Sequence, residues 1–524
     1  MRSYFSIFNP KEKFKNHYKE FFNWDVATFS KLLTKKNAHF FEKEGEKRAL
    51  NLFKEASQKI PAYKIFLKKN KINPKKIKTI DNFKLLPITN KKNYLRKYSL
   101  PSLYYKNKFF NLESISVSSG STGKPFFWPR GSYLEFETTY LYELFLKNFF
   151  EIDKFPTLLI IGYSVGIYIA GVFTLNTCLR LAQKGYPLTV ISPGINKDEI
   201  LRIIKELSPQ YSQTVLAGYP PFIKDIIADG ISYGINWRKI KIKFIFGAEG
   251  FSEDWRDYIF EKTGSKNVLK DSMNTYGSAD AAILGHETPL SILIRRLSSK
   301  DKELNQALFN DLRLPSLHQY YPFLKFFEKT EKGDLIFTTR GGLPLLRYNI
   351  GDQGGIISFN KMMKILNQYG YSLNLIKSEL RKYNAEHLFW KLPFVYLFGR
   401  ADLAATLYGV KIYPENIKAG LEDKNLKNIC NAKFVMSTKY NKNQDQYLFI
   451  NIELLKNIKP SQVLTKKIKN IVIKNLRATN LECNRLFEAI DPKAILKIKL
   501  STYGKSKYFL ASIKQNWVIK NQKF

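Results

Sequence analysis

Short apolar runs alternate with amphipathic stretches through the middle of the chain. Four apolar runs predict buried β-strands: Leu158–Ile161, Leu188–Ile191, Thr214–Ala217 and Phe244–Phe246. Three stretches between or after them predict helices: Asp198–Leu207, Phe222–Ala228 and Ser252–Thr263. This alternation is typical of parallel strands with helices on both faces. Ligands bind such sheets beyond the carboxyl ends of the strands. Several polar motifs fall at those ends here, which indicates an enzyme rather than a scaffold.

The flanking regions predict further helices and a second domain. Residues 1 to about 95 are charged and have a helical pattern, and Tyr133–Phe150 predicts a long helix rich in aromatic residues. The lysine-rich residues 356–394 predict a helical insertion. Residues 400–524 have strand-like runs and a helix of their own. We therefore expect an α/β fold, in which a large N-terminal domain (1–399) has mostly parallel sheets flanked by helices, followed by a small C-terminal α+β domain (400–524).

Composition narrows the classes of function. The chain has 524 residues and is 44% hydrophobic, which favours more than one packed core and excludes a disordered scaffold. Its net charge of +40 would suit a nucleic-acid or membrane partner. However, Lys is spread along the chain among Asn and Ile, which favours a general bias in composition and no specific nucleic-acid site. A field that attracts nucleotides and other acids stays open, as does weak peripheral contact with a membrane.

Cysteine usage and the N-terminus predict a cytoplasmic protein. The three cysteines and five histidines form no metal-ligand spacing, which indicates a reducing compartment and no structural zinc. Residues 1–10 lack the apolar core of a signal peptide. The uncharged run Thr157–Asn176 is interrupted by glycines, so it predicts a strand, a turn and a helix rather than a transmembrane span.

The stretch Ser118–Pro125 has the composition of an anion-binding loop. Its eight residues include four hydroxyl side chains, two glycines and one lysine. Glycines allow backbone N–H groups to approach an anion closely, and hydroxyls add donors for phosphate oxygens. The spacing differs from that of a Walker A loop, because two residues rather than four separate the glycines and Pro125 follows the lysine. Taken alone, the stretch is equally consistent with a polar surface turn.

Further polar stretches follow in a fixed order. They are Phe246–Gly250, Asn274–Asp280, Leu345–Asp352, Phe398–Asp402 with Tyr408–Ile417, and Tyr503–Lys507. Together with Ser118–Pro125, in this order and spacing, they resemble the adenylate-forming ligase superfamily and, within it, the phenylacetate–CoA ligase-like family. Ile60–Phe66 and Leu86–Leu95 resemble that family's N-terminal region. The resemblance extends from about residue 50 to about residue 508.

The resemblance implies a two-step reaction. A carboxylate attacks the α-phosphate of ATP, which gives an acyl adenylate and pyrophosphate; a thiol, usually that of CoA, then displaces AMP. Catalysis of such steps depends mainly on positioning and on neutralising charge. The family uses ATP, Mg²⁺ and CoA, and its C-terminal domain is a mobile lid. By resemblance, the phosphate loop consists of Ser118, Ser119, Gly120, Ser121, Thr122, Gly123 and Lys124.

The resemblance also assigns the remaining nucleotide contacts. Asp352 accepts hydrogen bonds from the ribose hydroxyls, and Arg400 helps to hold the nucleotide. Asp402 matches the hinge of the lid. Lys505 matches the catalytic lysine that neutralises charge between the carboxylate and the α-phosphate, and it leaves the site for thioester formation. The adenine pocket is assigned to Gly247, Ala248, Glu249, Tyr276 and Gly277.

Some positions depart from the family pattern. Asp280 stands where the family usually has Glu, so contact with Mg²⁺ there is expected through a shorter side chain. Leu403 replaces a second acidic residue at the hinge, which weakens expectations about the second step. The acid pocket is expected after the strand at 157–161, where Tyr163 and Tyr168 could pack against a flat acid. Both tyrosines are equally consistent with core aromatics.

The sequence thus predicts an ATP-dependent acid ligase that works through an acyl adenylate and binds a small-molecule carboxylic acid. Two alternatives stay open. The acyl group could pass to a carrier-protein thiol or an amine in surface-polysaccharide or secondary metabolism. The chain could also be a decayed ligase fold that binds anionic polymers, which the charge of +40 and the departures at Asp280 and Leu403 would suit.

Overall fold

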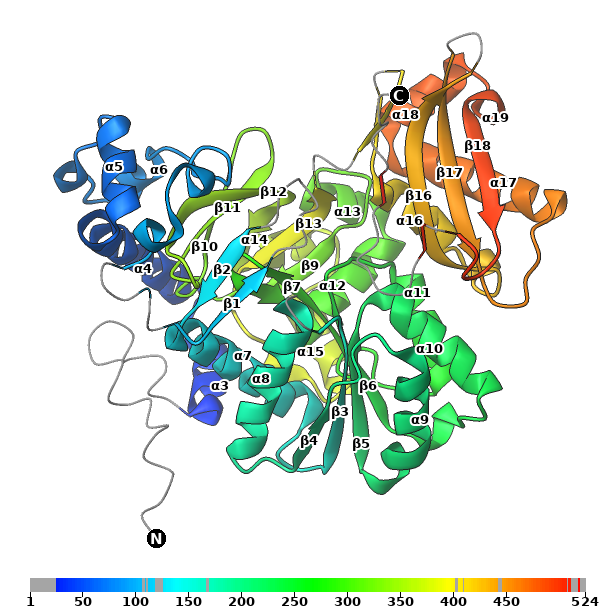
Figure 1. Ribbon diagram of the computed structural model, residues 1–524, viewed down its shortest axis with the longest axis horizontal. Coiled ribbons are helices and arrows are strands. Elements are labelled where there is room, and N and C mark those ends of the chain that lie inside the picture. The colour runs from blue at the N-terminus through cyan, green and yellow to red at the C-terminus, as the bar shows by residue number, and fades with distance from the viewer. Residues whose placement is uncertain are drawn as a thin grey trace.

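The computed structural model describes residues 25–105, 109, 112–117, 126–165, 169–400, 404–408, 410–441, 445–506, 508–509 and 517–518 (Figure 1). All structural statements below concern these residues.

An eleven-stranded sheet forms the centre of the large part of the protein. Its strand order is β10-β11-β12-β13-β9-β8-β7-β6-β5-β3-β4. The parallel half consists of β3 (Thr157–Gly162), β4 (Leu188–Ile191), β5 (Gln213–Gly218), β6 (Ile242–Gly247) and β7 (Ser272–Ser278). The other strands pair antiparallel: β8 (Ala282–His286), β9 (Ser316–Gln319), β10 (Phe326–Lys329), β11 (Asp334–Thr339), β12 (Leu345–Ile357) and β13 (Phe394–Arg400). All four predicted strands are therefore present as β3 to β6.

Alternate residues of the parallel strands face two separate cores. Leu158 and Ile160 of β3 pack into one apolar cluster, whereas Leu159 and Ile161 pack into another on the opposite face. This follows from the two-residue period of a strand, which explains why these strands are apolar throughout. The first cluster includes side chains of α9 (Lys197–Leu207), α10 (Pro220–Ser232), α11 (Glu253–Thr263), α12 (Pro289–Lys300), α13 (Lys302–Phe309), α14 (Phe359–Gln368) and α15 (Leu373–Lys382). The second includes α3 (Val26–Lys35), α7 (Ser132–Phe150) and α8 (Ile169–Gln183).

The antiparallel half of the sheet curls back on itself. β8 and β9 share one ladder pair, His286 with Gln319, so the sheet can bend there. In a flat sheet β7 and β12 would lie about 19 Å apart, because three strands separate them. In this protein the Tyr276 hydroxyl of β7 lies 2.7 Å from the Asp352 carboxylate of β12. The curl encloses a third apolar core, which is closed by α4 (Ala38–Lys59), α5 (Pro61–Lys69) and α6 (Ile80–Lys84) (Figure 1).

The C-terminal part has its own α+β core. A three-stranded sheet of β16 (Cys430–Tyr440), β17 (Gln446–Leu454) and β18 (Leu496–Ser501) lies beside the hairpin of β14 (Ala405–Leu407) and β15 (Val410–Ile412). All described residues of its apolar cluster come from Ala405 onward, so this core is separate from those of the large part. This arrangement agrees with the predicted small domain, whereas its boundary at 399/400 stays a prediction. The helices are α16 (Pro414–Leu421), α17 (Gln462–Thr479), α18 (Leu481–Ala489) and α19 (Pro492–Ile495).

The uncharged run Thr157–Asn176 forms β3 and the first half of α8, with the turn between them only partly described. None of the described helices combines the length and apolar character that crossing a membrane requires. All three cysteines are buried and have free thiols.

A glycine allows β12 and β13 to pair closely. A Cβ atom on Gly354 would lie 1.8 Å from the backbone oxygen of Tyr396 on β13. We predict that Gly354→Ala pushes the two strands apart and lowers the free energy of unfolding by about 1–3 kcal/mol, as overpacking does. Urea denaturation measures the loss, with Gln353→Ala as the neighbouring control. Equal stability of Gly354→Ala and wild type would contradict the close approach.

Candidate active site

Strand pairing brings the predicted adenine and ribose residues together. Gly247 ends β6 and pairs with Thr275 of β7, so Tyr276 follows directly at the same edge of the sheet. The Tyr276 hydroxyl donates a hydrogen bond of 2.7 Å to Asp352. Asp352 in turn lies opposite Arg400 in the β12–β13 ladder. Residues that are 153 positions apart in the sequence, from Gly247 to Arg400, thus meet at one place.

The segment after β6 makes a tight turn at this edge. Ala248 has a φ of 67°, a left-handed conformation that non-glycine residues seldom adopt. The Asn274 side-chain amide donates to the Glu249 backbone oxygen at 3.4 Å, which ties the turn to β7. Gly277 lies at a register shift in the β7–β8 ladder, directly after Tyr276. The backbone around the Tyr276 ring is therefore irregular on both sides.

Asp280 is a buried carboxylate with two partners. The Tyr348 hydroxyl donates to it at 2.7 Å, and the Lys91 ammonium lies 3.3 Å away. No group of three or more His, Cys, Asp or Glu side chains among the described residues could hold a metal ion. A single carboxylate can hold Mg²⁺ only together with water or ligand phosphates, so contact between Asp280 and Mg²⁺ stays a prediction. We derive no step through Mg²⁺.

The phosphate loop is flanked by a hairpin anchored beside Asp280. Ser118, Ser119, Gly120, Ser121, Thr122, Gly123 and Lys124 lie outside the described residues, and so do Tyr168 and Asp402. The loop joins β1 (Ser114–Val117) to β2 (Phe127–Arg130). The buried Arg130 donates to the Ser116 hydroxyl at 3.0 Å and to the Ala279 backbone oxygen at 3.1 Å. The hairpin that flanks the loop is thus anchored to Ala279, the residue before Asp280.

Tyr163 is a buried residue at the carboxyl end of β3. Its hydroxyl donates to the Ile245 backbone oxygen at 3.1 Å, and its ring meets Tyr219 edge-on at 5.1 Å between centroids. Burial raises its pKa well above the usual range. These contacts are typical of a core aromatic residue that packs against β6. A role of Tyr163 in the acid pocket stays a prediction.

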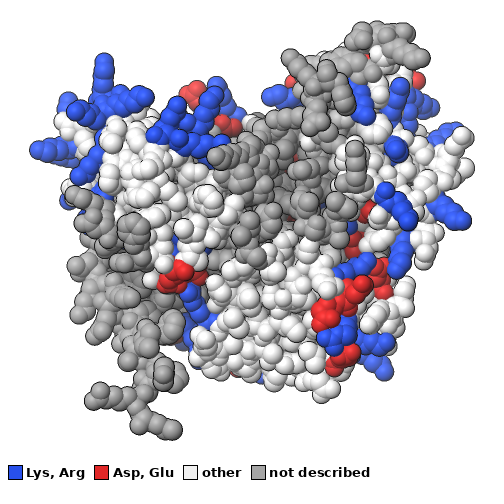
Figure 2. All heavy atoms as spheres, in the orientation of Figure 1, with Lys and Arg blue, Asp and Glu red and all other residues white. Residues whose placement is uncertain are grey.

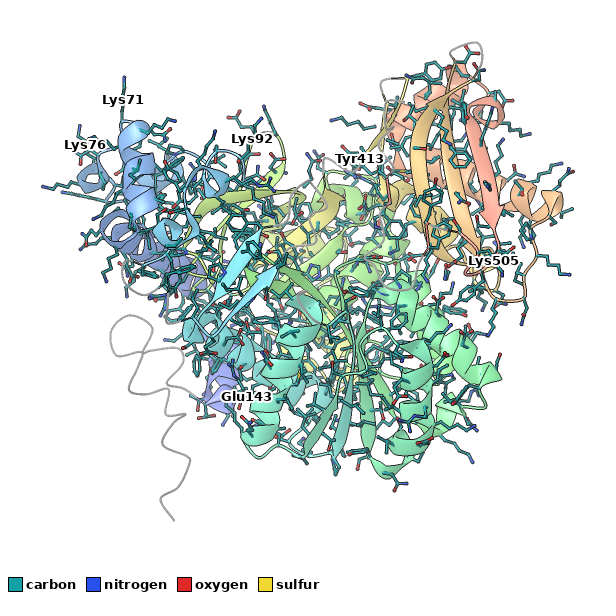
Figure 3. All side chains as sticks on the ribbon, viewed as in Figure 1. Lys71, Lys76, Lys92, Glu143, Tyr413 and Lys505 are labelled. Atoms are coloured by element: carbon teal, nitrogen blue, oxygen red, sulfur yellow. The ribbon has the colours of Figure 1, made fainter. Side chains whose placement is uncertain are left out.

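Lys505 lies away from this group of residues. It is exposed, and it forms no ion pair within the described part of the chain. Its neighbour Tyr503 accepts a hydrogen bond of 2.9 Å from Lys197, at the start of α9. Figure 3 shows the labelled Lys505 at the base of the C-terminal part, on the side of α10. The structure therefore gathers Gly247, Tyr276, Asp352 and the Arg400 backbone, and leaves Lys505 outside.

Sequence reasoning missed a buried ion network that supports Tyr276. The Arg256 guanidinium, fully buried in α11, contacts Glu253, Glu287 and the Ser272 hydroxyl. Glu287 also accepts the Asn274 backbone N–H at 2.8 Å, which fixes the strand that carries Tyr276. Burial alone would raise the pKa of Glu253, but Arg256 and its arginine neighbours lower it to about 2. No spacing in the sequence distinguishes these charges from surface charges.

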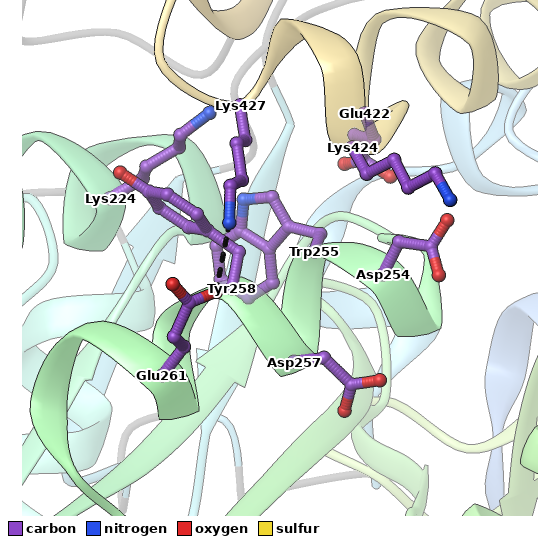
Figure 4. Close-up of a pocket in the computed structure, with 9 residues that line it drawn as sticks. All are labelled: Lys224, Asp254, Trp255, Asp257, Tyr258, Glu261, Glu422, Lys424 and Lys427. Carbon is purple, nitrogen blue, oxygen red and sulfur yellow. Dashed lines mark hydrogen bonds and ion pairs between the residues drawn. The ribbon is translucent and has the colours of Figure 1, made fainter.

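Sequence reasoning also missed how the C-terminal part contacts the turn after β6, part of which is assigned to the predicted adenine pocket. Lys418 of α16 donates to the Gly250 backbone oxygen at 2.6 Å and pairs with Glu249 at 3.4 Å. Glu422 accepts the Ser252 backbone N–H at 2.7 Å. Glu422 also lines a crevice of about 140 Å³. Figure 4 shows its lining residues, among them Lys427, which pairs with Glu261. Lys418 and Lys427 both follow the predicted hinge region in the sequence. That position is the one sequence signal that could have pointed to them.

A buried carboxyl packs against the strand that leads to the predicted hinge. Gly399 has a φ of 108°, and a Cβ atom there would lie 2.1 Å from Glu415 Oε1. Glu415 Oε2 is buried without a hydrogen-bond partner in the described structure. Burial raises the pKa of Glu415 to about 7, although Arg313 and Lys418 act in the opposite direction.

We predict that Arg256→Met lowers the free energy of unfolding by about 3–5 kcal/mol, because it leaves the Glu287 carboxylate buried without a cation. Urea denaturation followed by fluorescence measures the loss. Arg202→Met is the matched control, since Arg202 pairs with Glu199 and Glu206 on the exposed face of α9 and should change stability little. Equal losses in the two variants would contradict the structural role of the buried network.

We predict that Glu415 makes stability fall as pH rises. The folded pKa of about 7 exceeds the ordinary 4.5, so the stabilising contribution is complete below about pH 4.5 and is lost as pH rises through 7. Glu415→Gln cannot ionise, and at pH 8 it should be more stable than wild type by on the order of 2 kcal/mol. Denaturation at pH 5 and pH 8 tests this against the exposed Glu331→Gln. A variant with the pH dependence of wild type would refute the assignment.

Comparison with known proteins agrees with the fold. No known protein-family model matches the chain. The phenylacetate–coenzyme A ligase of Thermus thermophilus is 20% identical over 383 residues, which are 72% of this chain and 74% of that protein. The solved structure of 2-hydroxyisobutyryl-CoA ligase in the postadenylation state with 2-HIB-AMP matches with a TM-score of 0.65, at 12% identity over 92% of this chain and 90% of that one.

An acyl acid amido synthetase in complex with 2,4-DB has a TM-score of 0.54, at 12% identity over 95% of this chain and 94% of that one. The resemblance read from the ordered motifs is thus confirmed by a curated relative and by solved structures. In sequence the chain is similar to a phenylacetate–coenzyme A ligase, and it has the fold of the adenylate-forming ligase superfamily.

Proposed function

We propose that this protein is an ATP-dependent carboxylic acid ligase. It activates the acid as an acyl adenylate with release of pyrophosphate, and it then transfers the acyl group to a thiol, for which we propose CoA. The curated relative is named as a CoA ligase, and a structural neighbour was solved with an acyl adenylate. Neither likeness identifies the acid or the acceptor of this chain.

One observation carries the proposal. Gly247, Tyr276 and Asp352 come from three motifs that are distant in the sequence, yet they form one continuous edge through the β6–β7 ladder and the Tyr276–Asp352 hydrogen bond. A carboxylate at such an edge can accept two hydrogen bonds from adjacent ribose hydroxyls. The neighbouring tyrosine ring and the backbone of the Gly247–Gly250 turn offer a flat face and polar groups for a purine. This arrangement supports the proposal of a nucleotide site at this edge.

The position of Lys505 has a consequence for this proposal. Lys505 can neutralise charge at the α-phosphate only if it approaches Asp280 and Asp352, and the described arrangement holds its segment beside α9. We therefore propose that the C-terminal part turns relative to the sheet between two arrangements. The described arrangement, in which Lys505 lies away from this edge, would suit the transfer step.

The proposal predicts acid-dependent exchange between ATP and pyrophosphate. A panel of aryl, hydroxy and sugar acids should include one that supports exchange in wild type. Asp352→Ala should reduce exchange by about two orders of magnitude because it removes the ribose contact, and Lys505→Ala should abolish it. Exchange by isotope incorporation is the measurement, and ATP binding by calorimetry separates a nucleotide defect from a chemical one.

The outcomes are distinguishable. Lys205→Ala, which removes an exposed lysine of α9, should leave exchange intact. Undiminished exchange in Asp352→Ala would refute the ribose assignment. Absence of ATP binding in wild type would refute the ligase and would favour a protein that binds anionic polymers.

A second acceptor class is supported by one specific observation. The amido synthetase neighbour matches over 95% of this chain, so the whole fold, including the C-terminal part, is compatible with a non-thiol acceptor. In that case an amine nitrogen, rather than a sulfur, attacks the acyl carbon and displaces AMP. Product analysis of one reaction with CoA and one with a mixture of amino acids decides between a thioester and an amide.

A further inference from the structure

A basic pocket of about 580 Å³ lies next to the candidate nucleotide site. One wall is the backbone of β12 from Tyr348 to Gly351, immediately before Asp352. The other wall is the loop after Thr89 and the short helix η3 (Leu95–Lys97). This second wall contributes Asn90, Lys91, Lys92, Arg96 and Lys97. In the proposed function this pocket has no assigned ligand.

The loop that carries these cations is fixed to β12. Thr89 donates its backbone N–H to Arg347 at 3.0 Å and its hydroxyl to Leu346 at 2.8 Å, and it accepts the Asn349 N–H at 2.8 Å. The Asn90 side chain accepts the backbone N–H of Lys92 at 2.8 Å. The backbone bearing Lys92 is therefore held in place before any ligand arrives, which reduces the entropy lost on binding.

The lining residues of the pocket carry an excess of positive charge. Four of its nine lining residues are Lys or Arg, and none is Asp or Glu. The surrounding sequence is also one-sided, because residues 61–112 contain fourteen Lys or Arg and one acidic residue, Asp81. Figure 2 shows Lys and Arg side chains gathered along the upper edge of the N-terminal part. A dianionic or more highly charged ligand is what such a wall attracts.

The pocket is linked to the candidate active site through Lys91. This side chain contacts the Asp280 carboxylate at 3.3 Å, and its ammonium lies 5.4 Å from the Trp128 ring of β2. Trp128 belongs to the strand that follows the predicted phosphate loop. The pocket therefore adjoins the hairpin that flanks the predicted phosphate loop.

We propose that Lys92, Arg96 and Lys97 form a second anion site, which binds a diphosphate group. The inference rests on the proposed function, which supplies two sources of this chemistry: the pyrophosphate that leaves ATP, or the diphosphate of an acceptor such as CoA. A single carboxylate would need one cation, whereas a diphosphate has several charged oxygens that match a row of lysine and arginine donors. The volume of the pocket is also sufficient for such a group.

The test is the double variant Lys92→Gln with Lys97→Gln. Its matched control is Lys75→Gln with Lys76→Gln, which removes the same charge from the exposed helix η2 (Pro74–Lys76). Figure 3 shows the labelled Lys76 at the outer end of the N-terminal helices, well apart from the labelled Lys92. Calorimetry at fixed salt measures the affinity of each full-length protein for inorganic pyrophosphate, CoA and pantetheine, the last of which lacks a diphosphate.

We expect the Lys92/Lys97 variant to bind a diphosphate ligand about tenfold more weakly than wild type, and the Lys75/Lys76 variant to bind it within about twofold. A loss for inorganic pyrophosphate assigns the site to the leaving group. A loss for CoA but not for pantetheine or pyrophosphate assigns it to the acceptor. Equal losses in both variants would reduce the effect to the general field of the protein and overturn the proposal, as would no loss in either.

The experiment separates failure of the diphosphate site from failure of the ligase assignment. Binding of pyrophosphate requires no turnover, so a protein without exchange activity can still show the site. Conversely, the Lys92/Lys97 variant could retain exchange activity and have the same affinity and KM for pyrophosphate and CoA as wild type. That result would leave the proposed function standing and refute the diphosphate site. Thermal melting of both double variants confirms that the substitutions leave the fold intact, since all four lysines are exposed.

Discussion

The rest of the structure depends on one constraint, the closure of the antiparallel half of the sheet. The hydrogen bond between Tyr276 and Asp352 shows that this closure is present. A flat sheet would keep β7 and β12 far apart, and the single ladder pair between β8 and β9 is where the bend occurs. The third apolar core fills the inside of the curl. Burial of that core therefore stabilises the same curvature that brings the candidate nucleotide residues together.

Strand β12 connects the two sites that we propose. Its residues 348–351 form one wall of the basic pocket, and the next residue, Asp352, lies in the candidate nucleotide site. The Tyr348 hydroxyl and Lys91 converge on Asp280 from the two walls. A ligand in either site thus touches a strand that is fixed by both β11 and β13, so the two sites have a common rigid support.

The parallel half of the fold could be predicted from the sequence because alternate residues of its strands are buried on both faces, which makes them apolar throughout. The curl could not be predicted, since β8 and β9 contribute only one paired position and no local pattern encodes a bend between them. The candidate site was predicted through its motif order rather than through its geometry. Arg256 was missed for a physical reason: a buried arginine with two carboxylate partners looks like any surface arginine in sequence.

The interface between the C-terminal part and the sheet is polar, which bears on whether the protein can move there. Its described contacts include Lys418 with the Gly250 carbonyl, Glu422 with the Ser252 amide and Lys433 with Asp225. The apolar clusters of the two parts share no described residue. Separation of such surfaces exposes polar groups that water can satisfy, whereas separation of a shared apolar core would lose hydrophobic stabilisation.

The same interface also joins movement to nucleotide binding. Lys418 contacts Glu249 and Gly250, the turn that we place beside the purine, so rotation of the C-terminal part must release that turn. A nucleotide that reshapes the turn would weaken these contacts, which help to hold the C-terminal part in the described arrangement. If nucleotide binding favours the arrangement that brings Lys505 towards Asp352 by some factor, then by linkage that arrangement binds the nucleotide more tightly by the same factor. Contacts far from the reacting atoms would then decide when the proposed catalytic lysine is present.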